Sequence, residues 1–457
     1  MPYGPGGPGG PAPRAKKGGA GRLIAVVIAV VVVVGIGVGG YAVFGRASGG
    51  TAASGGPLKG KVLWQSQDAP QNALGLSFLG GWHTADLTVT VAPRGLVAYD
   101  ARTGRRRWQL PSPPLPAGGA SLICGVSTTT AGNVGVIGFG AGSGGTVTKC
   151  EGFALVDLAT GRTRGQGTLQ SGTSLGDNTM SAEVIAGTAV IEYGGSLTGY
   201  DLSGHQRWRL GPKAAGGDCF VNDLLPGTNT ATVLFDCLGS DHTVTVAQVS
   251  PANGTIAKKA PVTIPASMDT ATFRLVSAQP VVLSGGPVDN GALITLDDAF
   301  QVRATIPQKD AAGTLDLSPY SGLASHMLIH AAVSSDTLVV ETKETAVSSL
   351  RETNKIVAFD LATGRERWAK SLGGKVTSVP VTFGKDGVIA MTNGTYENPP
   401  RVFRLAAADG KATPMGPAYS RDFIQKPRTS RLYWDGTRLF GISLTTVTGT
   451  PSVYALG

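Results

Sequence analysis

The chain has little charge and no strong excess of either sign. Asp, Glu, Lys and Arg make up 15% of its 457 residues, against roughly 25% in an average globular domain. The net charge is +9, and residues 1–22 supply +4 of it because they hold four basic residues and no acid. The remaining +5 is too small to indicate a nucleic-acid-binding surface, so we expect no nucleic-acid partner.

The chain also lacks the common signatures of metal and catalytic sites. It has no Cys-x-x-Cys pair and no His-Glu-x-x-His motif, the spacings that bring zinc ligands together. His326 and His330 lie four residues apart, but two imidazoles without a third ligand make a poor metal site. We therefore expect no catalytic residue, no cofactor and no metal, and a protein that is not an enzyme.

A long uncharged segment near the N-terminus indicates membrane anchoring. Leu23 to Phe44 is a run of 22 residues without a charge, and as a helix it would span about 33 Å, enough for the hydrocarbon core. Basic residues precede the run, which favours a cytoplasmic N-terminus. We predict one transmembrane helix over residues 23–45 of a single-pass cell-membrane protein; a cleaved signal peptide is the alternative.

The segments that flank this predicted helix are short. Residues 1–22 are rich in Pro and Gly and basic, which predicts a disordered cytoplasmic tail. Residues 46–59 are interpreted as a linker. Gly35 and Gly39 have the spacing that lets two membrane helices approach closely, so a weak helix-mediated dimer is a further hypothesis.

Beyond the linker the chain consists of degenerate repeats. The two fullest copies are GLVAYDARTGRRRW at 95–108 and KIVAFDLATGRERW at 355–368. The C-terminal SVYALG (452–457) and the early GKVLWQ (60–65) join into another copy. Partial copies complete a set of eight, at 153–161, 197–208, 246–254, 291–297 and 401–410. A unit of about 50 residues suits a four-stranded blade with its loops.

A repeat divided between the two ends indicates a closed ring, in which the first strand completes the last blade. Closure of this kind removes exposed sheet edges. We therefore predict an all-β fold, an eight-bladed β-propeller over residues 60–457, preceded by the disordered tail and the transmembrane helix. A seven-bladed ring is the alternative.

Each full copy places a tight turn between two strands and a tryptophan on the second strand. Asp100 can accept bonds from the N–H groups of the turn, and Gly104 supplies the positive φ that the turn needs. Asp360 and Gly364 hold the same positions in the copy at 355–368. We expect the indoles at the matching position to pack between neighbouring blades; they belong to Trp64, Trp108, Trp208 and Trp368.

Four cysteines follow the predicted membrane helix, on the side where disulfides form. They are Cys124, Cys150, Cys219 and Cys237, and the sequence allows three pairings. We favour Cys124–Cys150 and Cys219–Cys237, because each pair lies within one repeat unit. A zinc site and four reduced, buried cysteines are the alternatives.

The repeat resembles that of a known superfamily. Ala98-Tyr99-Asp100-x-x-Thr103-Gly104-x-x-x-Trp108, met again from Ala358 to Trp368, is similar to the tryptophan-docking repeat of the PQQ-like β-propellers. Members include quinoprotein alcohol dehydrogenases and BamB-type assembly lipoproteins. The dehydrogenases hold their quinone with a vicinal disulfide, a stacking Trp and a calcium ion, and this sequence has no Cys-Cys pair and no acidic cluster with calcium-loop spacing. The resemblance therefore implies the fold without implying PQQ binding.

These observations favour a non-catalytic, extracytoplasmic binding or scaffold protein. Its rigid rim would contact a protein or a cell-envelope polymer, and the basic run Arg105 to Arg107 is one place where it could touch an anionic surface. The longest insertion, 309–354, is expected near any ligand site because long loops on a rigid scaffold carry binding residues. A ligand-sensing ectodomain that signals through a membrane partner is the second hypothesis, and a quinone-dependent dehydrogenase is the third.

Overall fold

The computed structural model describes most of the chain beyond residue 56. The described residues are 57–66, 79–115, 118–143, 146–170, 179–216, 218–237, 243–266, 268–287, 290–317, 330–348, 351–395, 397–423, 427–444 and 451–457. The predicted tail (1–22), the predicted membrane helix (23–45), most of the predicted linker and His326 lie outside them. None of the helices in the described ranges has the length and hydropathy needed to cross a bilayer.

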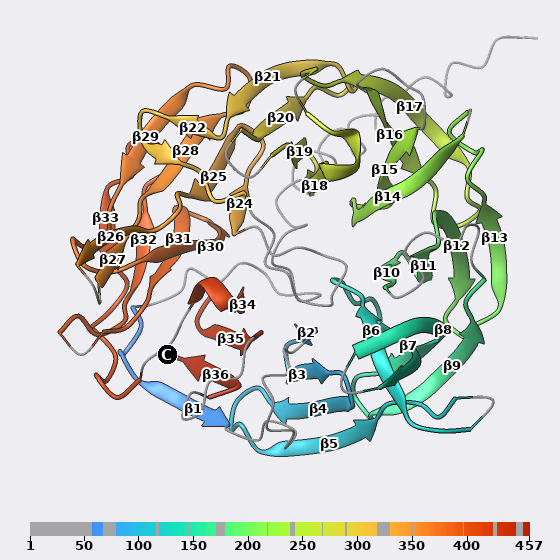
Figure 1. Cartoon of the computed structure of the whole chain (residues 1–457). Helices are drawn as coiled ribbons and strands as arrows, with labels where there is room; N and C mark the ends of the chain where they lie inside the picture. Colours follow the sequence, from blue (N-terminus) through green and yellow to red (C-terminus); the bar gives the residue numbers. More distant parts are fainter. Residues whose placement is uncertain are drawn as a thin grey trace, which may run out of the picture. The chain divides into compact units, whose positions relative to one another are not determined.

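Eight four-stranded antiparallel sheets follow one another around a circle, which confirms the predicted eight-bladed β-propeller (Figure 1). The first strand of each blade lies toward the centre and the fourth at the circumference. The continuous apolar runs of the repeats, such as Leu96 to Tyr99, explain these strands, since each sheet buries both faces against its neighbours. We number the blades 1 to 8 from β2 onward and call their successive strands the first, second, third and fourth rings.

The strands of blades 1 to 4 follow each other without interruption in the sequence. Blade 1 is β2 (Gly80–His83), β3 (Leu87–Ala92), β4 (Gly95–Asp100) and β5 (Arg106–Pro111). Blade 2 is β6 (Ser121–Val126), β7 (Val134–Ser143), β8 (Thr146–Asp157) and β9 (Arg162–Thr168). Blade 3 is β10 (Ser181–Ile185), β11 (Thr188–Tyr193), β12 (Ser196–Asp201) and β13 (Gln206–Leu210). Blade 4 is β14 (Cys219–Pro226), β15 (Ala231–Cys237), β16 (Thr243–Val249) and β17 (Ile256–Thr263).

Blades 5 to 8 include the insertion and the ring closure. Blade 5 is β18 (Arg274–Ala278), β19 (Val281–Gly285), β20 (Ala292–Leu296) and β21 (Val302–Pro307). Blade 6 is β24 (Ala331–Val333), β25 (Thr337–Glu341), β28 (Ile356–Asp360) and β29 (Glu366–Lys370). Blade 7 is β30 (Ser378–Gly384), β31 (Gly387–Thr392), β32 (Val402–Leu405) and β33 (Ala412–Pro414). Blade 8 is β34 (Ser430–Trp434), β35 (Leu439–Ser443), β36 (Val453–Leu456) and β1 (Val62–Ser66).

Additional short elements decorate this ring. The insertion 309–354 supplies two blade strands, β24 and β25, and two hairpins outside the blades. These hairpins are β22 (Lys309–Asp310) with β23 (Gly313–Thr314), and β26 (Thr345–Ser348) with β27 (Arg351–Thr353). The 3₁₀ helices η2 (Thr270–Thr272) and η3 (Pro427–Thr429) precede the first strands of blades 5 and 8.

The two ends of the propeller sequence pair in blade 8. Val62 lies opposite Leu456, Trp64 opposite Ala455 and Gln65 opposite Tyr454. β36 also pairs with β35 on its other side, so no blade is left with three strands. Contacts with the propeller already occur before the predicted boundary at residue 60, because Leu58 is buried and donates its N–H to the Met415 carbonyl at 2.6 Å.

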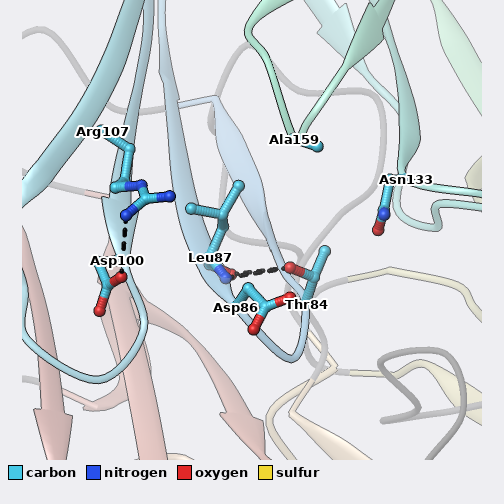
Figure 2. Close-up of a pocket in the computed structure, with 7 residues that line it drawn as sticks. All are labelled: Thr84, Asp86, Leu87, Asp100, Arg107, Asn133 and Ala159. Carbon is cyan, nitrogen blue, oxygen red and sulfur yellow. Dashed lines mark hydrogen bonds and ion pairs between the residues drawn. The ribbon is translucent and has the colours of Figure 1, made fainter.

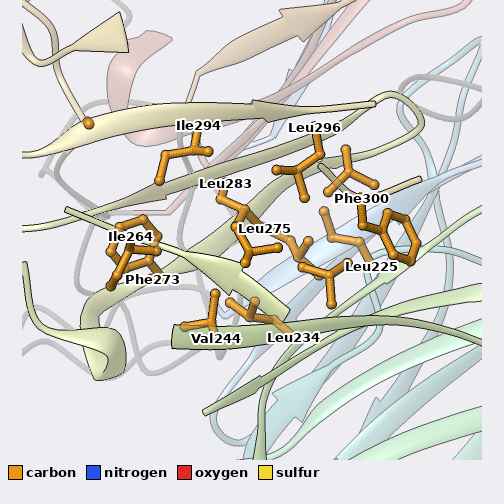
Figure 3. Packing of buried hydrophobic residues seen from close by; sticks show 14 of the residues in the cluster. Leu225, Leu234, Val244, Ile264, Phe273, Leu275, Leu283, Ile294, Leu296 and Phe300 are labelled. Atoms are coloured by element: carbon orange, nitrogen blue, oxygen red, sulfur yellow. The ribbon is translucent and has the colours of Figure 1, made fainter. Parts of the chain in front are cut away.

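The hydrophobic core lies between neighbouring blades. Figure 3 shows the seam of blades 4 and 5, where Leu225, Leu234 and Val244 meet Leu275, Leu283 and Ile294. Burial of each such side chain stabilises the fold by about 1.5–3 kcal/mol. Equivalent clusters fill the other seams, so the blades stabilise one another around the whole ring.

Candidate functional site

The four tryptophans of the repeat join consecutive blades. Each projects from a fourth-ring strand and donates its indole N–H to a backbone carbonyl in the next blade. The donor–acceptor distances are 3.0 Å from Trp64 to Ala101, 2.9 Å from Trp108 to Leu158, 2.7 Å from Trp208 to Pro251 and 2.9 Å from Trp368 to Ala407. These side chains therefore act in the structure of the ring.

The turn glycines receive these rings. A Cβ atom on Gly104, whose φ is +67°, would lie 2.6 Å from the indole of Trp64, and Gly410 stands in the same relation to Trp368. Gly364 differs, because blade 5 carries Ala304 where blades 1, 3, 6 and 8 carry a tryptophan, and the nearest atom to a Cβ there would be that of Ala304 at 3.0 Å. Glycine at these positions is required by both backbone conformation and close approach.

The turn aspartates fix the loops that carry those glycines. The Asp100 carboxylate accepts the N–H of Thr103 at 2.9 Å, and this bond lowers the pKa of Asp100. Asp360 accepts the N–H of Thr363 at 2.9 Å, and it also accepts a bond from the Arg367 guanidinium at 2.6 Å. The bond from Arg367 is the largest contribution that lowers the pKa of Asp360 to about 2.

Two features of the fourth ring were not predicted from the sequence, one recurring and one confined to a single seam. An arginine seven residues after the turn aspartate pairs with it, as in Arg164 with Asp157 at 3.1 Å. The constant spacing of these two residues could have been recognised in the repeats. At the seam of blades 4 and 5, Lys258 replaces the tryptophan and lies 4.2 Å from the ring centroid of Phe300. Phe300 takes the place of the turn glycine with φ +62°.

A small polar pocket lies at the seam of blades 1 and 2 (Figure 2). Its volume is about 210 Å³, and its lining comprises Thr84, Asp86, Leu87, Asp100, Arg107, Asn133 and Ala159. Arg107 reaches Asp100 at 3.6 Å. In blade 6 the equivalent Arg367 bridges Asp336 at 3.1 Å and Asp360 at 2.6 Å. The pocket is thus a variant of a repeated surface feature.

A buried ionic cluster lies beside the insertion. Arg428 of η3 forms ion pairs with Asp316, with Glu341 at 3.2 Å and with Glu344 at 2.7 Å. Asn354 donates to Glu341 at 3.0 Å. Burial raises the pKa of Glu341 to about 8, against the opposing charge of Arg428. The cluster joins the insertion to blade 8, because the insertion supplies the carboxylates and η3, which leads into blade 8, supplies Arg428.

His330 is the described member of the predicted histidine pair. Its Nε2 lies 3.0 Å from the backbone carbonyl of Arg428, and burial lowers its pKa to about 4. It therefore belongs to the surroundings of the ionic cluster. Among the described residues, no three His, Cys, Asp or Glu side chains are grouped so that they could hold a metal ion.

Other carboxylates are buried in the first two rings. Glu183 accepts the N–H of Thr129 at 2.9 Å and its hydroxyl at 2.5 Å. Burial raises the pKa of Glu183 and Glu192 to about 7 and that of Asp223 to about 6. Asp223 accepts the backbone N–H groups of Leu224 and Leu275. Their hydrogen bonds link neighbouring strands and loops, which is a structural use of a carboxylate.

All four cysteines are in disulfides. The structure joins Cys124 to Cys150 within blade 2, and Cys219 to Cys237 within blade 4. These are the two pairings that the repeat boundaries favoured.

The similarity of this chain to known proteins is one of fold. No family model and no curated protein matches the chain. BamB from Moraxella catarrhalis is 13% identical over 81% of this chain and 93% of its own, with a TM-score of 0.46. Quinohemoprotein alcohol dehydrogenase from Comamonas testosteroni is 14% identical over 88% and 76%, with a TM-score of 0.49. The C-terminal WD40 domain of Sif2 is 8% identical over 87% and 98%, with a TM-score of 0.47.

The two groups named from the repeat, BamB and the quinoprotein alcohol dehydrogenases, are both among the solved structures that this chain is similar to. We draw no activity from likenesses this distant. By its own sheets the chain is an eight-bladed β-propeller, and it is similar to the PQQ-like propellers.

Proposed function

We propose that this protein is a non-catalytic binding or scaffold protein, held at the outer side of a cell membrane by a helix over residues 23–45. Its propeller would present a rigid outer surface to another component of the cell envelope. Two disulfides suit an oxidising compartment, and the uncharged run at 23–44 supports the anchor.

One observation carries this proposal: the buried polar side chains bond to other parts of the propeller, and the exposed ones lie on its outer surface. The ionic cluster around Arg428 is satisfied by its own partners, and the buried carboxylates bond to neighbouring backbone groups. The seam pocket, at about 210 Å³, is smaller than the roughly 300–1,000 Å³ typical of small-molecule sites. Exposed polar groups lie on the outside of the ring, and the docked tryptophans and the pairing of β1 with β36 make this ring rigid. Such a surface suits a large partner.

The insertion offers a position from which to test this proposal. Val347 lies in the hairpin β26–β27 and is 51% exposed, unusually for a large apolar side chain. A photoreactive residue at Val347 of the full chain, irradiated in native membranes, should give covalent adducts with an envelope component. The same residue at Ala85, in the tight turn between β2 and β3, is the matched control and should give none. Equal labelling, or none from either position, would contradict a specific surface beside the insertion.

Two further measurements separate this proposal from its alternatives. Protease added outside intact cells should digest the propeller and spare a tag at residue 1; protection of the propeller would contradict the extracytoplasmic location. Full chain supplied with PQQ and calcium should reduce no electron-accepting dye with an alcohol or a sugar. Sustained turnover would establish the dehydrogenase instead.

A further inference from the structure

The fourth-ring strands carry charge of almost one sign. The eight strands β1, β5, β9, β13, β17, β21, β29 and β33 contain eleven Lys or Arg residues and a single acid, Glu366. Their net charge of +10 exceeds the +9 of the whole chain. The cations occur in six consecutive blades, 1 to 6, and the fourth strands of blades 7 and 8 have none. We call these eleven side chains the basic belt.

The three inner rings have the opposite balance. Their strands contain ten Asp or Glu residues and four Lys or Arg residues, a formal net charge of −6 with every carboxylate counted as ionised. The modest overall charge therefore hides a radial separation, with negative charge inside and positive charge at the circumference.

Part of the belt is available to an external partner. Arg107, Arg164 and Arg367 are paired with aspartates of their own blades. Four other arginines are exposed and have no side-chain partner within the described part of the chain; they are Arg106 on β5, Arg162 on β9, Arg207 on β13 and Arg303 on β21. Their strands follow the circumference in order from blade 1 to blade 5 (Figure 1).

Protection of sheet edges does not explain this pattern. Outer strands are edge strands, and charged side chains on them prevent edge-to-edge pairing. Charges of either sign serve that purpose, whereas here eleven of twelve are positive. The uniform sign is the expected property of a surface that binds an anion.

We propose that the basic belt binds a flexible anionic polymer of the cell envelope, one that carries phosphodiester or carboxylate groups along its backbone. The belt follows the curved side of the ring, so a flat bilayer would meet only part of it. Duplex DNA, with a persistence length of about 50 nm, is too stiff to follow it. Arginine forks pair with both phosphate and carboxylate groups. This inference rests on the extracytoplasmic location proposed above.

The test uses the full chain in detergent with polyphosphate and polygalacturonate as probes. The belt variant is Arg106→Gln, Arg162→Gln, Arg207→Gln and Arg303→Gln together. Its matched control also removes four exposed positive charges, but outside the fourth ring: Lys149→Gln, Lys355→Gln, Lys385→Gln and Arg401→Gln. Since both variants lose the same net charge, any difference between them reports on position.

We expect the belt variant to bind at least about tenfold more weakly and the control to stay within about twofold of the parent. The slope of log affinity against log salt should flatten by about 3 in the belt variant, from roughly 0.7 for each of four lost contacts with a flexible chain. Equal losses in the two variants would show a non-specific charge effect and overturn the proposal, as would failure of the parent to bind either polymer.

The same experiment also tests other anionic ligands of the belt. Vesicles containing phosphatidylglycerol and a DNA duplex are titrated with the parent and the belt variant. Tighter belt-dependent binding of either one would assign the belt to a bilayer or to nucleic acid and overturn the polymer proposal. Photo-crosslinking from Val347 is independent of the belt, so failure of the binding or scaffold function can be distinguished from failure of this inference.

Discussion

Strands β4 and β5 are neighbours in blade 1, joined by residues 101–105, and they differ in nearly every physical respect. In β4 the four central residues, Leu96 to Tyr99, are buried, and the strand's one charge is an aspartate at its end. β5 begins with two exposed arginines and buries little besides part of Trp108. The same contrast separates inner rings from the fourth ring in blades 2, 3 and 6. The inner rings and the docked tryptophans hold the fold, which leaves the exposed arginines of the fourth ring that are not paired with an aspartate free for another purpose.

Removing Ser452–Gly457 should break the inner framework most severely. The deletion takes away β36, which pairs with both β35 and β1, and with it the fully buried Tyr454. We expect the shortened chain to lose its cooperative thermal transition, measured by circular dichroism in detergent. Deletion of residues 1–22 is the control and should leave the transition in place. A cooperative transition at the parent's Tm in the C-terminal deletion would contradict the role of closure.

Replacing the docked tryptophans tests how much the packing of the fourth ring against the next blade contributes to stability. Trp368→Ala should lower the free energy of unfolding by about 3–5 kcal/mol, because it removes a buried ring that fits a glycine turn. Trp108→Ala should cost less, since Trp108 is only half-buried and has the same indole hydrogen bond. Denaturant titrations of the two variants give the comparison. Equal losses would mean that burial between blades does not set the contribution.

The buried carboxylates make stability depend on pH. The pKa of Glu341 is raised to about 8, and the pKa values of Glu183 and Glu192 are raised to about 7. The folded protein therefore keeps protons that the unfolded chain has released, and stability falls as pH rises toward 8, by up to about 1.4 kcal/mol per pH unit for each proton held. His83 and His330, whose pKa values are lowered to about 4, reduce stability only below pH 6.5.

Thermal unfolding at pH 6.5 and pH 8 measures this dependence. We expect a lower Tm at pH 8, and a smaller decrease in Glu341→Gln because the amide does not titrate. Glu366→Gln, on the exposed edge of blade 6, is the matched control and should leave the decrease unchanged. An identical decrease in Glu341→Gln and the parent would contradict the effect assigned to Glu341.

Neutralising the fourth ring should have the smallest effect on folding. Each of the four exposed arginines of the belt variant makes no side-chain hydrogen bond or ion pair with the described residues, so each substitution should change stability by no more than about 0.5 kcal/mol. Denaturant titration of the belt variant gives the value. A large loss of stability would show that the belt supports the fold and would remove the distinction between the rings.

Much of the fold was predictable because the copies of the repeat can be aligned with one another, which shows where each blade begins and ends. The division of one unit between residues 452–457 and 60–65 predicted closure, and β1 pairs with β36 as expected. The tryptophans were recognisable because their spacing from the turn glycine is constant. The seam of Lys258 and Phe300 was not predictable, because a lysine over an aromatic ring shares no residue type with the pair that it replaces.

The candidate sites were less predictable. The ionic cluster joins Asp316 and Glu341 to Arg428, about a hundred residues away in the sequence. Nothing in the local sequence of any of these residues indicates the others. The pairing of Arg164 with Asp157 was within reach, since both belong to one repeat and recur at a fixed spacing.

The sequence by itself determined the closure of the ring, favoured eight blades over seven, and identified the four tryptophans that join one blade to the next, since these follow from local periodicity and from copies that can be aligned. Only the tertiary structure decided the radial separation of charge, the burial of Glu183 and Glu341, and the partners of Arg428. Burial and electrostatic environment depend on which distant segments pack together, and a linear pattern does not contain that information.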